Sequence, residues 1–152
     1  MSIAPIVRSV VVQVEAARAF EVFTRRMQDW WPRGKTIGGQ PHVAVVMEPW
    51  VDGRWFERDA QGNETQWGKV LAWDPPQRLL LGWQIGSDWA YRADLLTEVE
   101  LSFKPLGSGG TLVTLEHRHL ERFGSEAARH REILDGGWPR LLGEFQKITD
   151  GL

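Results

Sequence analysis

The chain has 152 residues, no cysteine and a formal net charge of −2, with 42% hydrophobic and 25% charged residues. This balance predicts one globular domain over residues 1–152. The lack of cysteine excludes disulfides, thiolate nucleophiles and zinc–thiolate or iron–sulfur centres, and the slight negative charge offers no basic surface for nucleic acid.

The N-terminal segment, Met1 to Pro5, has no basic stretch that leads into a long apolar run, so it is not a secretory signal. The longest tight apolar run, Val43 to Met47, is far too short to span a bilayer. We therefore expect a cytoplasmic protein without a membrane span.

The first elements along the chain are a strand and a helix. Residues 6–14 are rich in β-branched side chains and predict a strand. From Glu15 to about Trp31, apolar residues recur every three or four positions and predict one helix, which Pro32 stops. The glycine-rich stretch 33–41 predicts a mobile loop.

Six strand-like segments follow, separated by short breaks that contain Gly, Pro, Asn or Asp. They cover residues 43–49, 54–58, 65–73, 78–85, 97–104 and 111–117. Breaks this short predict antiparallel neighbours. Val99, Leu101 and Phe103 share one face of their strand, which predicts a sheet with one packed side.

The C-terminal part is predicted to be helical, in two pieces. Residues 126–134 can form a short helix that Gly136-Gly137 interrupts. A second helix begins near Trp138, with Pro139 in its first turn, and carries one strongly apolar face. The sheet is the only large apolar partner for that face.

Several short motifs, in this order and spacing, resemble one known family. They are Ala19-Phe20-Glu21-Val22-Phe23, Trp30-Trp31, Val51-Asp52-Gly53-Arg54-Trp55, Gly68-Lys69-Val70-Leu71, the segment from Trp73 through Asp74-Pro75-Pro76 to Trp83, residues 110–117, and Gly137-Trp138. The chain is similar over nearly its whole length to the activator of heat shock protein 90 ATPase homologue-like proteins of the START-like (SRPBCC, Bet v-type) superfamily.

The resemblance implies an α+β helix-grip fold of order β-α-α-β-β-β-β-β-β-α. In this fold a curved antiparallel sheet wraps a long C-terminal helix, and a cavity lies between them. Members are associated with apolar small molecules or stress responses, and some superfamily relatives are cyclases. The chain lacks the additional N-terminal domain of the eukaryotic co-chaperone, so we do not expect direct activation of a chaperone ATPase.

The nine tryptophans, against one tyrosine, are the most unusual feature of the composition. Tryptophan serves both as core filling and as the wall of small-molecule pockets, and either role fits here. Trp73 is expected to be structural, and Trp89 to be a lid or an interface residue. The candidate ligand-binding residues are Trp30, Trp31, Trp55, Trp67, Trp83, His117, Trp138 and Leu142.

Polar candidates are few. His117 shares a face with Val113 and Leu115. It is either a core histidine, a general base, or a group that orients a ligand alone or together with Arg54. His117 and His119 have metal spacing but no evident third ligand. Charges around the turn at residues 48–57 are either a solvated rim or an acid–base cluster.

These observations leave three hypotheses open. The first is a binding module for a small apolar or aromatic molecule, with no cofactor and no metal, for which a stress response is one setting. The second is a cyclase- or hydrolase-like enzyme that uses the same pocket, with His117 as acid–base. The third is a co-chaperone-like module with a protein partner or a homodimer surface, which would expose an apolar patch such as Trp89 and Tyr91.

Overall fold

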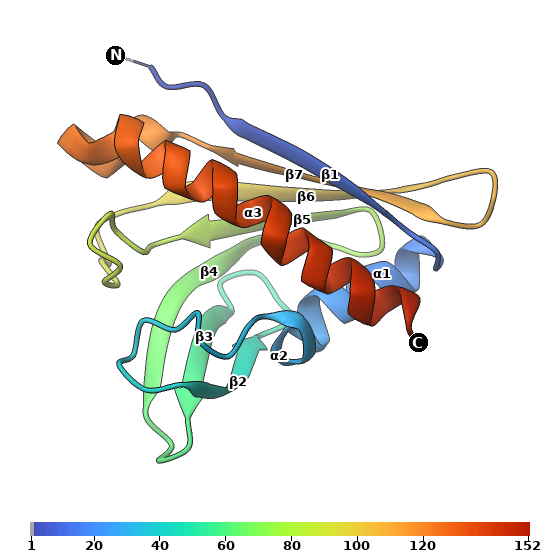
Figure 1. Cartoon of the computed structure of the whole chain (residues 1–152), viewed down its shortest axis with the longest axis horizontal. Coiled ribbons are helices and arrows are strands. Elements are labelled where there is room, and N and C mark those ends of the chain that lie inside the picture. The colour runs from blue at the N-terminus through green and yellow to red at the C-terminus, as the bar shows by residue number, and fades with distance from the viewer. Residues whose placement is uncertain (1) are drawn as a thin grey trace.

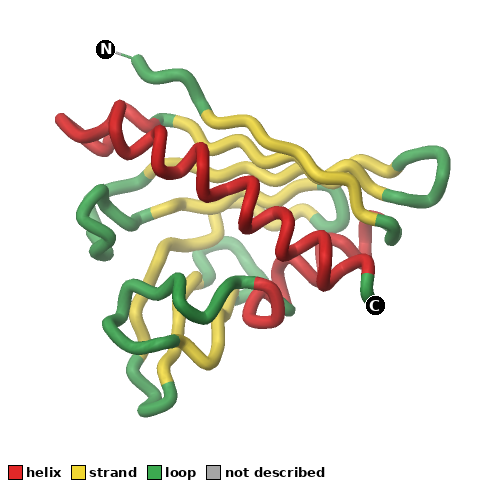
Figure 2. The backbone as a smooth tube through the Cα atoms, viewed as in Figure 1, coloured by secondary structure: helices red, strands yellow, loops and turns green. Residues whose placement is uncertain are grey.

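A computed structural model describes residues 2–152 and shows a curled antiparallel sheet that holds a long C-terminal helix (Figure 1; Figure 2). The strands are β1 (Ile6–Val12), β2 (His42–Met47), β3 (Arg54–Asp59), β4 (Glu64–Asp74), β5 (Arg78–Trp83), β6 (Thr97–Pro105) and β7 (Thr111–Arg118). The helices are α1 (Ala16–Arg25), α2 (Met27–Trp30), the 3-10 helix η1 (Leu120–Glu126) and α3 (Ala127–Asp150). The predicted helix-grip fold and its element order are confirmed, with η1 as an addition before α3.

The sheet order is β1-β7-β6-β5-β4-β3-β2, so the first strand pairs with the last. Ile6 lies opposite His117, and all neighbouring strands are antiparallel. Register shifts occur where β4 meets β3, at Trp55/Phe56, and where it meets β5, at Val70/Ala72. Such irregularities bend a strand, and β4 carries the sheet round from the β5 side to the β3–β2 side (Figure 1).

One face of the sheet is packed, as the alternation predicts. Val99, Leu101 and Phe103 are almost fully buried on β6. Six of the nine tryptophans are also buried, namely Trp30, Trp31, Trp55, Trp67, Trp83 and Trp138. Within residues 2–152, no helix is long and apolar enough to cross a membrane.

The predicted helix over residues 15–31 is instead two helices with a break at Arg26, whose φ is −119°. Side chains compete there for the carbonyls of the last turn. Thr24 Oγ1 donates to the Phe20 carbonyl at 2.7 Å, and the Trp30 indole donates to the Val22 carbonyl at 3.2 Å. Hydrogen bonds from a threonine hydroxyl to the helix backbone bend helices, and here the chain bends just before the two final tryptophans, Trp30 and Trp31.

The predicted interruption at Gly136-Gly137 is wrong, because α3 runs without a break from Ala127 to Asp150. Two glycines cost a helix roughly 1 kcal/mol each, and the packing of α3 on the sheet offsets that cost. Pro139 cannot donate to the Asp135 carbonyl. Arg8 of β1 donates to that carbonyl at 3.5 Å and to Asp135 Oδ1 at 2.9 Å, which ties the helix to the sheet edge.

Candidate functional site

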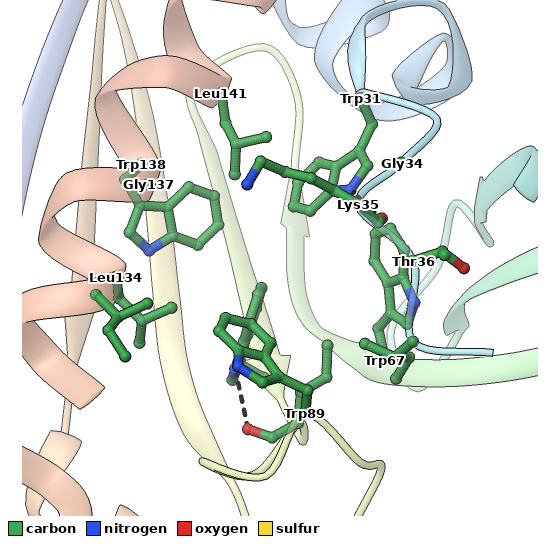
Figure 3. A pocket seen from close by; sticks show the side chains of 14 residues that line it. Trp31, Gly34, Lys35, Thr36, Trp67, Trp89, Leu134, Gly137, Trp138 and Leu141 are labelled. Atoms are coloured by element: carbon green, nitrogen blue, oxygen red, sulfur yellow. Dashed lines mark hydrogen bonds between the residues drawn. The ribbon is translucent and has the colours of Figure 1, made fainter. Parts of the chain in front are cut away.

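A cavity of about 280 Å³ lies between α3, the sheet and the loop that joins α2 to β2. Five tryptophans are among the fourteen residues that line it, and four of them are buried: Trp31, Trp67, Trp83 and Trp138. Figure 3 shows Trp31 and Trp67 on one side, Trp138 with Leu134 and Leu141 on the helical side, and Trp89 at one end. The volume lies just below the usual range for small-molecule sites, about 300–1,000 Å³.

The four wall tryptophans come from four different elements and contact one another. The ring centroids of Trp31 and Trp67 are 4.8 Å apart, and those of Trp83 and Trp138 are 5.5 Å apart. Trp31 also meets Trp138 edge-on at 6.2 Å. Tilted and edge-to-face contacts at these distances are the favoured geometries of aromatic pairs, so the wall is one connected aromatic surface.

Each of the four indole N–H groups donates to a protein atom. The acceptors are the Lys35 carbonyl for Trp31 at 3.1 Å, Glu57 Oε1 for Trp67 at 2.8 Å, the Ile85 carbonyl for Trp83 at 3.1 Å, and His117 Nδ1 for Trp138 at 3.1 Å. These bonds fix the ring orientations before any ligand arrives. They also use up the donors, so the four rings offer a ligand apolar surface only.

Glu57 anchors both the wall and the loop over it. Its buried carboxylate accepts hydrogen bonds from Trp67 Nε1, from the Thr36 hydroxyl and from the backbone N–H of Ile37 at 2.8 Å. The N–H of Gly38 adds a longer bond at 3.3 Å. The acid–base role considered for Glu57 therefore gives way to a positioning role, because its oxygens are directed at the loop and at Trp67.

His117 lies behind the wall. Its Nδ1 accepts from Trp138, so Nε2 carries the proton and faces Thr97 Oγ1 at 2.8 Å. Burial, with a smaller contribution from the charge of His130, lowers the pKa of His117 to about 3. A neutral, fully paired imidazole is a core histidine and has no free nitrogen to offer a ligand.

The cavity wall contains only part of the candidate set. Trp31, Trp67, Trp83 and Trp138 are on it, whereas Trp30, Trp55, His117 and Leu142 are not. Trp30 and Trp55 are turned into the core, where the Trp55 indole donates to Met27 Sδ at 3.3 Å. Leu141, not Leu142, faces the cavity, together with Leu134.

Other candidates also lie away from the cavity. Arg54 is exposed and pairs with Glu48 at 3.1 Å and Glu64 at 3.2 Å, which is a solvated rim. His119 follows β7 with a left-handed φ of 65°, and its ring lies at the surface near Glu98. Over the described part of the chain, no group of three His, Cys, Asp or Glu residues could hold a metal ion.

The sequence reasoning missed the loop side of the cavity. Lys35 is the single titratable residue among those that line it, and Figure 3 shows its side chain extended across the opening with the amine toward Leu141. In residues 2–152 this amine makes no ion pair. A loop has no periodicity that would reveal such a residue. Leu134 follows helical spacing from Trp138, but the expected helix break separates the two residues, whereas Leu141 lies on the same predicted helix as Trp138.

Comparison with solved structures identifies several relatives. An anthrahydroquino-γ-pyrone synthase, Txn09, solved in complex with a molecule designated SUM, is 39% identical, with a TM-score of 0.69 and 97% of each chain covered. CalC of Micromonospora echinospora, a self-sacrificing resistance protein, is 30% identical, with a TM-score of 0.70 and coverage of 97% of this chain and 95% of CalC. The Aha1 dimer of Colwellia psychrerythraea shares the fold at 12% identity, with a TM-score of 0.66 and 97% of each chain covered.

A search of curated proteins finds no match. The family model described as Activator of Hsp90 ATPase homolog 1-like protein matches residues 13–150, which include every strand after β1 and every helix. The chain therefore belongs to the Activator of Hsp90 ATPase homolog 1-like family, within the helix-grip proteins of the SRPBCC superfamily.

Proposed function

We propose that this protein binds a small, planar, apolar aromatic molecule between α3 and the sheet. The observation that carries the proposal is the wall of four tryptophans with all four indole N–H groups already bonded. Such a wall favours a ligand that presents ring faces and edges and needs few hydrogen bonds. Preorganised rings lose little entropy on binding, which raises affinity for a small contact area.

Lys35 supplies the polar end of the site. Its amine lies at the opening and suits a phenolate, carboxylate or carbonyl oxygen on the rim of an aromatic ligand. The relative at 39% identity supports a ligand of this kind, because it is an anthrahydroquino-γ-pyrone synthase, and the relative at 30% identity is a resistance protein. A binder that sequesters a toxic aromatic compound would act in a stress response.

A second candidate function is catalysis on a polycyclic aromatic substrate, and the 39% identity to the synthase over 97% of the chain favours it. In that case Lys35 is the residue that can move a proton in the cavity, and the tryptophans hold the substrate flat. Incubation with an anthrahydroquinone that carries an unclosed side chain, followed by mass spectrometry, tests this. Turnover lost in Lys35→Met would support it, and unchanged substrate with the native chain would contradict it.

The binding proposal is tested by filling the cavity from the helix. A side chain at Gly137 would start in open space on the cavity wall, and one at the exposed Gly136 would start in open space outside it. Gly137→Leu adds four carbon atoms to a cavity of about 280 Å³, and Gly136→Leu is the matched control with the same gain in helix propensity.

The measurement is calorimetric titration with 2-naphthol and with anthraquinone, using decanoic acid as a non-aromatic comparison. We expect the native chain and Gly136→Leu to bind the aromatic probes, and Gly137→Leu to lose at least tenfold in affinity. The proposal fails if neither aromatic probe binds the native chain, or if both leucine variants bind equally well.

A further inference from the structure

A second hollow, of about 380 Å³, adjoins the tryptophan cavity and shares Trp89 and Ile133 with it. Its other walls are polar: Ser87, Asp88, Glu126, Arg129 and His130. The two compartments are therefore neighbours with opposite chemistry. Trp89 stands between them, with its ring at the end of the cavity (Figure 3).

His130 lines this second compartment and carries an unsatisfied buried polar atom. The residue is 2% exposed, and within the described residues its Nε2 has no hydrogen-bond partner. Its ring is held edge-on between Trp89 at 5.0 Å and Phe123 at 4.7 Å. Leaving a buried polar group unpaired is costly, so an unpaired imidazole nitrogen in a residue that lines a hollow calls for an explanation.

Trp89 adds a second free group and backbone strain at the same place. Its φ is +61°, a conformation that bulky residues adopt at a cost and that recurs at functional sites. The tight turn is fixed by the Trp89 N–H to the Gly86 carbonyl at 2.9 Å and by the Arg92–Asp88 ion pair at 2.7 Å. Unlike the four wall tryptophans, its indole N–H donates to no protein atom in residues 2–152, and the residue is 43% exposed.

The charges of the compartment nearly cancel. Arg92 pairs with Asp88, and the remaining lining charges are the acidic Glu126 and the basic Arg129, one of each sign, neither in an ion pair among the described residues. A strongly charged ligand group gains little from such a balance. A neutral group with several hydroxyls can both donate to the carboxylates and accept from Arg129, Trp89 and His130.

We propose that this compartment is a second subsite, which takes a neutral, hydroxyl-bearing appendage of the aromatic ligand. The inference rests on the proposed function, because the aromatic part must sit in the tryptophan cavity. The full ligand would then be an aromatic ring system with a polyhydroxylated group, such as a sugar, attached on the side that faces Trp89.

The test is a matched pair of probes, 2-naphthol and 2-naphthyl β-D-glucopyranoside, titrated calorimetrically. We expect the glucoside to bind about tenfold more tightly than 2-naphthol, the gain of one or two net hydrogen bonds. His130→Leu should abolish that tenfold advantage and leave 2-naphthol affinity unchanged. Its fold should hold, because replacing an unpaired buried polar group by an apolar one is close to neutral.

Arg129→Ala is the second variant, since this exposed residue makes no ion pair in residues 2–152, and Arg140→Ala on the same helix is its control outside both compartments. Arg129→Ala should reduce the glucoside advantage, and Arg140→Ala should not. If 2-naphthol binds and the glucoside binds no better, the subsite is refuted and the aromatic cavity stands. If neither probe binds, the proposed function itself is refuted.

Discussion

Acid should weaken the fold because of one buried histidine. His117 lies among Trp83, Trp138 and Phe123, and both of its nitrogens are paired to neutral groups, Thr97 and Trp138. Burial therefore lowers its pKa from 6.5 to about 3. In the unfolded chain the same ring takes up a proton near its ordinary pKa.

The direction and size of the change in unfolding free energy with pH follow from the difference in proton binding between the folded and unfolded states. Between pH 6.5 and about 3 the unfolded state binds more protons than the folded state, so the unfolding free energy falls as the pH falls. One pKa unit is worth about 1.4 kcal/mol, which gives a loss of about 2 kcal/mol between pH 8 and pH 5 and about 5 kcal/mol below pH 3. Burial also lowers the pKa of His130, which adds to the loss in the same direction.

The assay is urea unfolding followed by tryptophan fluorescence at pH 8, 6 and 5. Stopping at pH 5 limits the contribution of Glu48, Asp59 and Glu64, whose pKa values are lowered in the fold, because in the unfolded chain these carboxylates take up protons mainly below pH 5, around 4.5 for Glu and 3.8 for Asp. His117→Gln can still accept from Trp138 and donate to Thr97 but cannot ionise. The unfolding free energy of this variant should therefore fall by about 2 kcal/mol less between pH 8 and pH 5 than that of the native chain.

His130→Gln is the control that isolates the second histidine. If His117→Gln keeps the full pH dependence of the native chain, the buried, neutral state of His117 is wrong. Nitrogen NMR of the native chain at pH 5 gives an independent check, since it should show a neutral ring protonated on Nε2.

Two further changes test how the wall is held and how α3 is built. Glu57→Ala removes the acceptor for the buried Trp67 indole and for the Ile37 N–H. It should lower the free energy of unfolding in urea by about 1–3 kcal/mol and speed amide exchange at Ile37 and Gly38. Unchanged exchange at these two amides would contradict the anchoring role. Gly143→Ala places a methyl group in open space within α3 and should raise the free energy of unfolding by up to about 1 kcal/mol. Thermal unfolding measures this gain, and a lower melting temperature would disprove the prediction.

Local patterns in the sequence determined the strands of the sheet, and the composition showed that tryptophan side chains are abundant. The alternation of Val99, Leu101 and Phe103 predicted the buried face of β6, since neighbouring side chains of a strand point to opposite sides whatever surrounds them. The same local rules misjudged α3. Glycines weaken a helix in isolation, but the burial of Leu134, Trp138 and Leu141 on one face keeps it continuous.

Only the tertiary structure decided which aromatic residues face the cavity. Trp30 and Trp31 are adjacent in the sequence, yet one fills the core and the other lines the cavity, because the helix ends between them. Two of the four wall rings are fixed by partners distant in the sequence, His117 for Trp138 and Glu57 for Trp67. For these two rings a hydrogen bond across the fold sets the direction, and no periodicity along the chain encodes it.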